Sequence, residues 1–198
     1  MKSDGRIKGE GALWPWLLSG LVLALALGIG AYLFFREAGT KEPPQTEAFQ
    51  QITSYSGPRV PFKLYFQSPD GRYLRPESRD VREMSTKSEQ VKEVVSELIR
   101  GPRAGLTPTF PAGARVKGVF IDSKGTAYVD FSRELQAEYP GGAWTETLTI
   151  YSLVNTLAQG FPEIKQVQVL VEGAGIDTLA GHIDTTRPFP PRPALDKE

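Results

Sequence analysis

The residues of this chain that could support acid–base, metal or nucleophilic chemistry are few and lie in short motifs. The single histidine, His182, precedes Asp184 in the sequence GHID, and the two could form a pair of metal ligands. Metal sites in proteins usually need three or four converging ligands. We therefore interpret His182 as a residue with a local structural role, and we expect no metal and no cofactor.

A second motif, VDFSRE, combines two carboxylates with a hydroxyl group. Asp130 and Glu134 could act as an acid–base pair, and Ser132 could act as a nucleophile. Ser132 lies outside the G-x-S-x-G pattern of hydrolases, so we interpret it as the N-cap of a helix over residues 133–139. The carboxylate pair supports an alternative function, that of a cell-wall hydrolase.

A third motif, YPGGAW at residues 139–144, is a glycine-rich loop between two aromatic residues. Such a loop could face a ligand, a polysaccharide or a partner protein. We expect instead that Trp144 closes the core at the start of the following helix. With the carboxylate pair, this loop leaves a polysaccharide-binding domain open as a further alternative.

The segment RGPRAGLTPTFPAG, residues 100–113, contains the arginines and glycines that are common in phosphate-binding loops. A phosphate-binding loop usually follows a strand and opens a helix, so that consecutive backbone N–H groups converge on the anion. Here the predicted order is the reverse, and three prolines each remove a backbone donor. We therefore predict a structural connection in which Gly101 ends a helix.

The elements that must position these motifs can be predicted from hydrophobic periodicity. A capping box at Thr86 and Glu89 opens a helix with apolar residues at positions 91, 94, 95, 98 and 99. A second helix is predicted from about Thr145 to Gly160. Strands are predicted at residues 62–67, 72–76, 114–122, 125–132 and 165–173, with 114–132 forming an antiparallel hairpin. This pattern indicates an α+β fold, a small mixed or antiparallel sheet with two main helices packed on one face.

The N-terminal region is predicted to be a membrane anchor. Residues 11–35 contain no charged side chain and are long enough to span a bilayer as one transmembrane helix. Because the cationic excess lies in residues 1–10, we place this N-terminus in the cytoplasm and the C-terminal domain outside the bacterial cytoplasmic membrane. A cleaved signal peptide is the alternative, although its apolar core would be shorter.

The rest of the chain divides by composition into a linker, a globular domain and a tail. Residues 36–59 show no sustained periodicity and form the predicted linker, residues 60–188 the domain, and residues 189–198 a Pro-rich extended tail. Residues 60–187 carry 15 Lys and Arg against 16 Asp and Glu, a formal charge of about −1. This balance excludes a nucleic acid as the expected partner. The chain has no cysteine, which excludes disulfides and thiolate chemistry.

Several of these segments together resemble a known family, the GerMN domain of sporulation and spore germination proteins. The resemblance spans about residues 62–188 and rests on the order of its segments, which are LIRGP (98–102), PAG (111–113), VDFS (129–132), YSLVNTL (151–157), VQVLVEG (167–173) and GHID (181–184). It implies an α/β fold similar to ring-building motifs, anchorage outside the bacterial cytoplasmic membrane, and a part in envelope assemblies without catalysis. The chain departs from GerM itself in having one such domain instead of a tandem.

The resemblance and the motifs together lead to one predicted function. We expect a single-pass membrane protein whose extracytoplasmic GerMN-like domain is a protein-interaction module in the assembly of a bacterial cell-envelope complex. The expected partner is an envelope or membrane protein, with a homo-oligomer as a further alternative. We assign no catalytic, cofactor-binding or metal-binding residue.

Overall fold

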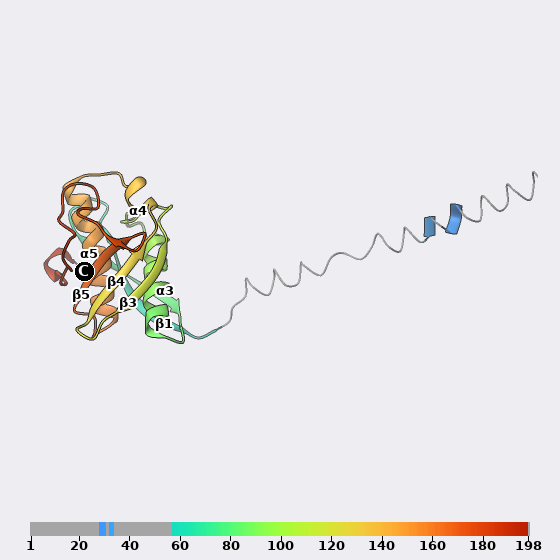
Figure 1. Ribbon diagram of the computed structural model, residues 1–198, viewed down its shortest axis with the longest axis horizontal. Helices are drawn as coiled ribbons and strands as arrows, with labels where there is room; N and C mark the ends of the chain where they lie inside the picture. Colours follow the sequence, from blue (N-terminus) through green and yellow to red (C-terminus); the bar gives the residue numbers. More distant parts are fainter. Residues whose placement is uncertain (1–27, 31, 34–56, 198) are drawn as a thin grey trace, which may run out of the picture. The chain divides into compact units, whose positions relative to one another are not determined.

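The computed structural model describes residues 28–30, 32–33 and 57–197 (Figure 1). The chain divides into two units, Met1–Tyr55 and Ser56–Glu198. The predicted transmembrane segment, residues 11–35, lies outside the described residues except for residues 28–30 and 32–33, which are helical. Within the described residues, no helix has both the length and the apolar character needed to cross a membrane.

The second unit begins with a long antiparallel hairpin. Strand β1 (Arg59–Gln67) pairs with β2 (Leu74–Arg82) along its full length. The turn between them is closed by the Ser68 hydroxyl, which accepts the backbone N–H of Arg72 at 3.3 Å and donates to the Asp70 carboxylate at 2.6 Å. Gly71 lies in the left-handed region at φ 72°, which glycine adopts without strain. Strand β2 begins at Leu74 and ends at Arg82, so it is longer than the strand predicted at residues 72–76.

A four-stranded sheet forms the other β layer, and its central strands lie side by side in Figure 1. The strand order is β3 (Val116–Ile121), β4 (Thr126–Phe131), β5 (Gln166–Val171) and β6 (Ala174–Gly175). The β3–β4 pair is the predicted antiparallel hairpin, and a bulge interrupts its register between Val116 and Gly118. Strands β4 and β5 are parallel, so the chain must cross over between them.

Helices supply this crossover and cover the sheet. Helix α3 (Lys87–Ile99) begins with the predicted capping box, in which the Thr86 hydroxyl accepts the Glu89 N–H at 3.3 Å. Helix α5 (Ala143–Gly160) connects β4 to β5 and follows the single-turn helix α4 (Glu134–Ala137). Both long helices contact the hairpin; α3 also contacts β3, and α5 also contacts β5.

The fold is α+β as predicted, but it contains two sheets instead of one. Helix α5 lies against the hairpin, and its polar side chains bond the backbone of β1. The Thr156 hydroxyl accepts the Tyr65 N–H at 3.0 Å, and the Ser152 hydroxyl donates to the Tyr65 carbonyl at 2.6 Å. At Tyr65, β1 therefore bonds a helix, and at Gln67 it exchanges two backbone hydrogen bonds, of 2.8 and 3.2 Å, with Thr107 of the loop after α3.

One hydrophobic core joins the hairpin, both helices and the inner face of the larger sheet. Its fully or almost fully buried members include Leu64 of β1, Val94 of α3, Leu153 of α5 and Val169 of β5. Burial of the stripe from Val91 to Leu98 agrees with the predicted apolar face of α3.

The segment predicted as a Pro-rich tail, 189–198, contacts this domain through its described residues. Phe189 and Val167 exchange two backbone hydrogen bonds, of 2.8 and 2.9 Å, beside β5. Farther on, a 3₁₀ turn, η1 (Pro193–Leu195), precedes a bond of 2.8 Å from the Lys197 N–H to the Leu74 carbonyl. The segment therefore continues the packing of the domain.

Candidate interaction surface

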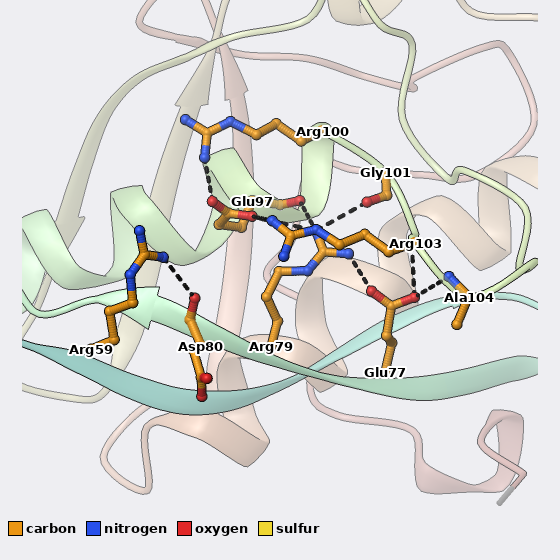
Figure 2. Close-up of polar contacts among 9 residues, drawn as sticks. All are labelled: Arg59, Glu77, Arg79, Asp80, Glu97, Arg100, Gly101, Arg103 and Ala104. Carbon is orange, nitrogen blue, oxygen red and sulfur yellow. Dashed lines mark hydrogen bonds and ion pairs between the residues drawn. The ribbon is translucent and has the colours of Figure 1, made fainter. Parts of the chain in front are cut away.

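The arginine- and glycine-rich loop at residues 100–113 connects α3 to β3, and its N–H groups do bind an anion. That anion is a side chain of the protein itself (Figure 2). The Glu77 carboxylate accepts the backbone N–H groups of Arg103 and Ala104 at 2.9 and 3.0 Å. The helix ends as predicted, with Gly101 in the left-handed region at φ 85°. Because Glu77 occupies these donors, the loop is a connection fixed to β2.

Arg79 links this loop to the last turn of α3, as Figure 2 shows. Its side chain is 1% exposed and ion-pairs with the carboxylates of Glu77 and Glu97. It also donates to the carbonyls of Glu97 at 3.2 Å and Gly101 at 3.0 Å. A guanidinium presents five donors in a planar fork, which lets one side chain join a strand, a helix and a loop.

The electrostatics of Glu77 follow from these contacts. Burial acts to raise the pKa of the Glu77 carboxyl, but the Arg103 N–H, the Arg79 guanidinium and the Ala104 N–H outweigh it and lower the pKa below its ordinary value. The carboxylate is therefore held charged in the folded protein. The alternation of side chains along β2 indicates that Glu77 and Arg79 are buried, since they share the inward face with Val81.

A second buried carboxylate organises the loop that follows β6. Glu146, in the first turn of α5, is 0% exposed. One of its oxygens accepts the N–H groups of Leu179 and Ala180, each at 3.0 Å, and the other accepts the His182 N–H at 3.1 Å. Glu146 lies four residues before Ile150, so the two side chains share the apolar face of α5. A charged residue on an apolar helix face is the sequence signal that could have indicated a buried carboxylate.

The predicted structural role of His182 has a geometric basis in this arrangement. Its Nδ1 lies 3.2 Å from the Glu146 carboxylate, while the imidazole remains partly exposed. Asp184 instead closes its own turn, accepting the Thr186 N–H at 2.9 Å and the Thr186 hydroxyl at 2.6 Å. Among the described residues, no group of three or more His, Asp or Glu side chains could hold a metal ion.

Asp130, Ser132 and Glu134 each make local contacts at the end of β4. Asp130 accepts the Gly173 N–H at 2.7 Å. The Ser132 hydroxyl accepts the Arg115 N–H at 3.1 Å, and α4 has no side-chain cap, so the predicted N-cap role of Ser132 is wrong. A hydrogen bond from the Ser132 side chain lowers the pKa of Glu134.

The aromatic loop does not close the core with Trp144, contrary to prediction. Trp144 is 47% exposed, and its indole N–H donates to the Gly71 carbonyl in the β1–β2 turn at 2.8 Å. Tyr139 is directed inward, and its hydroxyl bonds the Thr149 hydroxyl at 2.8 Å. Burial of Tyr139 raises its pKa to about 12. Gly141 and Gly142, both at positive φ, let the chain turn sharply between these two aromatic residues.

The outer face of the four-stranded sheet carries two neighbouring aromatic side chains, of which Phe120 is exposed and Tyr128 is half-buried. Phe120 is 64% exposed and lies 6.1 Å, between ring centroids, from Tyr128 on the neighbouring strand. The register places them directly opposite each other, on the face away from the buried Ala127 and Val129. We call Phe120 and Tyr128 the aromatic pair. An exposed aromatic cluster on a sheet face is a typical feature of a protein-binding surface.

The match of a family model assigns the chain to a family. The model described as Germane, sporulation and spore germination, matches residues 63–177, more than half of the chain. This chain therefore belongs to the Germane family, which is linked to sporulation and germination, and the predicted GerMN resemblance is confirmed. No curated protein matches the sequence significantly.

Solved structures show the same fold. The first GerMN domain of the sporulation protein GerM from Bacillus subtilis aligns with a TM-score of 0.53 and 22% identity, covering 67% of this chain and 98% of that domain. The tandem GerMN domains of the same protein align with a TM-score of 0.54 and 22% identity, covering 69% of this chain. The match covers 47% of the tandem, so this chain spans about half of its length.

Proposed function

We propose that the chain is a membrane-anchored, extracytoplasmic protein-interaction module in the assembly of a bacterial cell-envelope complex. Membership in the Germane family supports a role in sporulation or germination. The anchor is residues 11–35, which are uncharged and preceded by the cationic residues of segment 1–10. The partner is an envelope or membrane protein, and the anchor raises the local concentration of the domain beside it.

The observation that carries this proposal is the contrast between the candidate chemical groups and the sheet face. Asp130 accepts the backbone N–H of Gly173, and Glu134 accepts a hydrogen bond from the Ser132 side chain and pairs with Arg133. The aromatic pair, by contrast, exposes a large apolar side chain to solvent. A docking surface uses exposed side chains of this kind, whereas a hydrolase needs carboxylates that are available to a substrate.

Site-specific crosslinking in the native host tests the interaction. A photoreactive amino acid replaces Phe120 in the full-length chain, and Lys63, exposed on β1, is the matched control position. We expect a discrete crosslinked product with an envelope or membrane protein from position 120 and none from position 63. If neither position captures a protein and the purified chain degrades cell-wall glycan in a manner that requires Asp130 and Glu134, the hydrolase alternative replaces this proposal.

Single cysteines test the proposed orientation, because the natural chain contains none. Ser3→Cys and Ser123→Cys place one thiol on each side of the proposed anchor. A membrane-impermeant maleimide should label the Ser123→Cys protein in intact spheroplasts and the Ser3→Cys protein only after permeabilisation. Labelling in the reverse pattern would show that the domain is cytoplasmic.

A further inference from the structure

A groove separates the last turn of α3 from the segment that leads into β3, and its lining combines apolar and cationic side chains. Ile99 comes from the helix, Ala114 from the incoming segment, and Val116 from the first position of β3. Arg100 and Arg115 stand on opposite walls, and the groove has a volume of about 330 Å³. We call this feature the arginine groove.

The positive charge around the arginine groove exceeds the local negative charge. Glu97 alone ion-pairs with the guanidinium groups of Arg79, Arg100 and Arg103. Glu77, the other carboxylate of this cluster, ion-pairs with Arg79 and accepts two backbone N–H groups of the loop. Three guanidiniums against two carboxylates leave a net charge of about +1 on the groove wall formed by the end of α3.

The second wall adds a guanidinium that is free of strong pairing. Arg115 is exposed, and within the described residues its guanidinium makes no hydrogen bond or ion pair. The charge of Arg115 does contribute to lowering the pKa of Glu134, which makes Glu134 a nearby negative group. The Glu134 carboxylate also lies 3.7 Å from the Arg133 guanidinium, and the Glu138 carboxylate accepts the Gly113 N–H at 3.1 Å beside the groove. With Arg115 and Arg133 against Glu134 and Glu138, the second wall has no net charge, so the positive excess belongs to the wall formed by the end of α3.

The position of the groove determines the shape of ligand that fits it. The groove runs beside the start of β3, which is an edge strand of the four-stranded sheet. An extended peptide can lie along such an edge. Beyond Val116 the edge is interrupted by the β-bulge, and the Lys92 ammonium donates to the Lys117 carbonyl at 2.9 Å. These features protect the rest of the edge, so the ligand must be short.

We propose that the arginine groove binds a short, extended, acidic segment of the partner protein. Its carboxylates pair with Arg100 and Arg115, and an apolar side chain between them packs on Ile99 and Val116. Charge complementarity identifies the occupant, and the apolar lining distinguishes a peptide from a simple anion. This inference rests on the proposed function and adds the chemistry of the partner.

Panning of a random decapeptide library against the full-length chain in zwitterionic nanodiscs tests the proposal. We expect enriched peptides to carry acidic residues next to an apolar residue, and their binding to weaken as salt concentration rises. Arg100→Gln and Arg115→Gln should each weaken the binding of such a peptide about tenfold or more, because each removes a charge-assisted hydrogen bond. Arg75→Gln, an exposed arginine of β2 outside the groove, is the matched control.

A steric variant separates groove binding from a folding defect. Ala112→Trp fills the groove without changing a charge, and it should abolish peptide binding while the melting temperature stays unchanged. Absence of enriched peptides, a lack of acidic preference, or binding that neither arginine affects would overturn the proposal. Complete competition by inorganic phosphate or by anionic lipid vesicles would show a simple anion site instead.

The test also distinguishes this proposal from the proposed function. If the groove variants change nothing while position 120 still captures an envelope protein in cells, the arginine groove is not the docking site and the interaction module stands. Concentration-dependent self-association that Ala112→Trp abolishes would identify a second copy of the chain as the occupant and overturn the choice of a partner segment.

Discussion

At the scale of single residues, two buried carboxylates act as internal ligands for backbone N–H groups. Glu77 holds the loop after α3, and Glu146 holds the loop after β6. Carboxylates accept such bonds strongly when they remain charged. The backbone N–H groups of both loops therefore bind a carboxylate of the protein itself.

Glu146→Gln should destabilise the domain by about 2 kcal/mol. The amide keeps one acceptor oxygen, but its NH₂ group cannot accept the N–H groups that face the other oxygen of Glu146. Denaturant unfolding measures the change, with Glu83→Gln at an exposed position as the control. Equal stability of the two variants would show that Glu146 is not required to hold the loop.

Glu77 should make the stability depend on pH in a definite direction. Its pKa is lowered in the folded state, so its contribution is complete above the unfolded-state value near 4.5 and is lost as pH falls through the folded value. Glu77→Gln should therefore be less stable at pH 7 and lose less stability than the wild type between about pH 5 and pH 3. Parallel pH profiles of unfolding free energy for the two proteins would contradict this assignment.

At the scale of elements, α5 combines the role of a core helix with that of a bonding partner for strand β1. Its buried side chains include Ser152, Asn155 and Thr156, which bond segments distant in sequence. In the sequence, a hydroxyl residue within an apolar helix face resembles an ordinary core residue, because nothing local indicates its hydrogen-bond partner. In the folded protein, Ser152 and Thr156 bond the backbone of β1 at Tyr65.

The double variant Ser152→Ala with Thr156→Val should weaken the docking of the hairpin. It conserves shape but removes three hydrogen bonds, two to the Tyr65 backbone and one between the Ser152 and Thr109 hydroxyls, at a cost of about 1 kcal/mol for each bond. Amide hydrogen exchange should rise more in β1 than in β5. Uniform exchange throughout the domain would indicate general core damage instead.

Sequence periodicity was sufficient for the helices and for the β3–β4 hairpin, because amphipathic spacing and a short turn are local properties. It could not reveal that the hairpin is a separate sheet, since the contacts of β1 are made by residues distant in sequence, such as Ser152 and Thr156, which lie 87 and 91 residues from Tyr65. The predicted core position of Trp144 is wrong for a similar reason, because the indole N–H bonds Gly71, which belongs to a turn distant in sequence. The arginine groove likewise depends on two segments, one ending at Arg100 and one entering β3.

At the scale of the whole molecule, the folded unit continues past the predicted boundary at residue 188. Asn155 of α5 donates to the Asp196 carboxylate at 2.7 Å and accepts the Arg192 N–H at 2.9 Å. Burial raises the pKa of Asp196. The C-terminal segment is thus a fixed part of the surface beside α5.

Deletion of residues 189–198 should lower the unfolding free energy by about 2 kcal/mol. Several hydrogen bonds of about 1 kcal/mol each are lost, and the greater freedom of the shortened chain end offsets part of the loss. Thermal unfolding of the full-length and truncated chains measures the effect. An unchanged transition would show that residues 60–188 are a complete stability unit, as the composition suggested.

The attachment of β1 to α5 has a consequence for how the protein is made. A chain leaves the ribosome or a translocation channel from its N-terminus, so the hairpin emerges long before residues 152 and 156. Until then its backbone edge cannot form the bonds it has in the native state, and unpaired strand edges favour aggregation. Pairing over such separations also slows folding. A holding chaperone at the exit site would therefore be expected to act on the hairpin during synthesis and to release it once α5 has emerged.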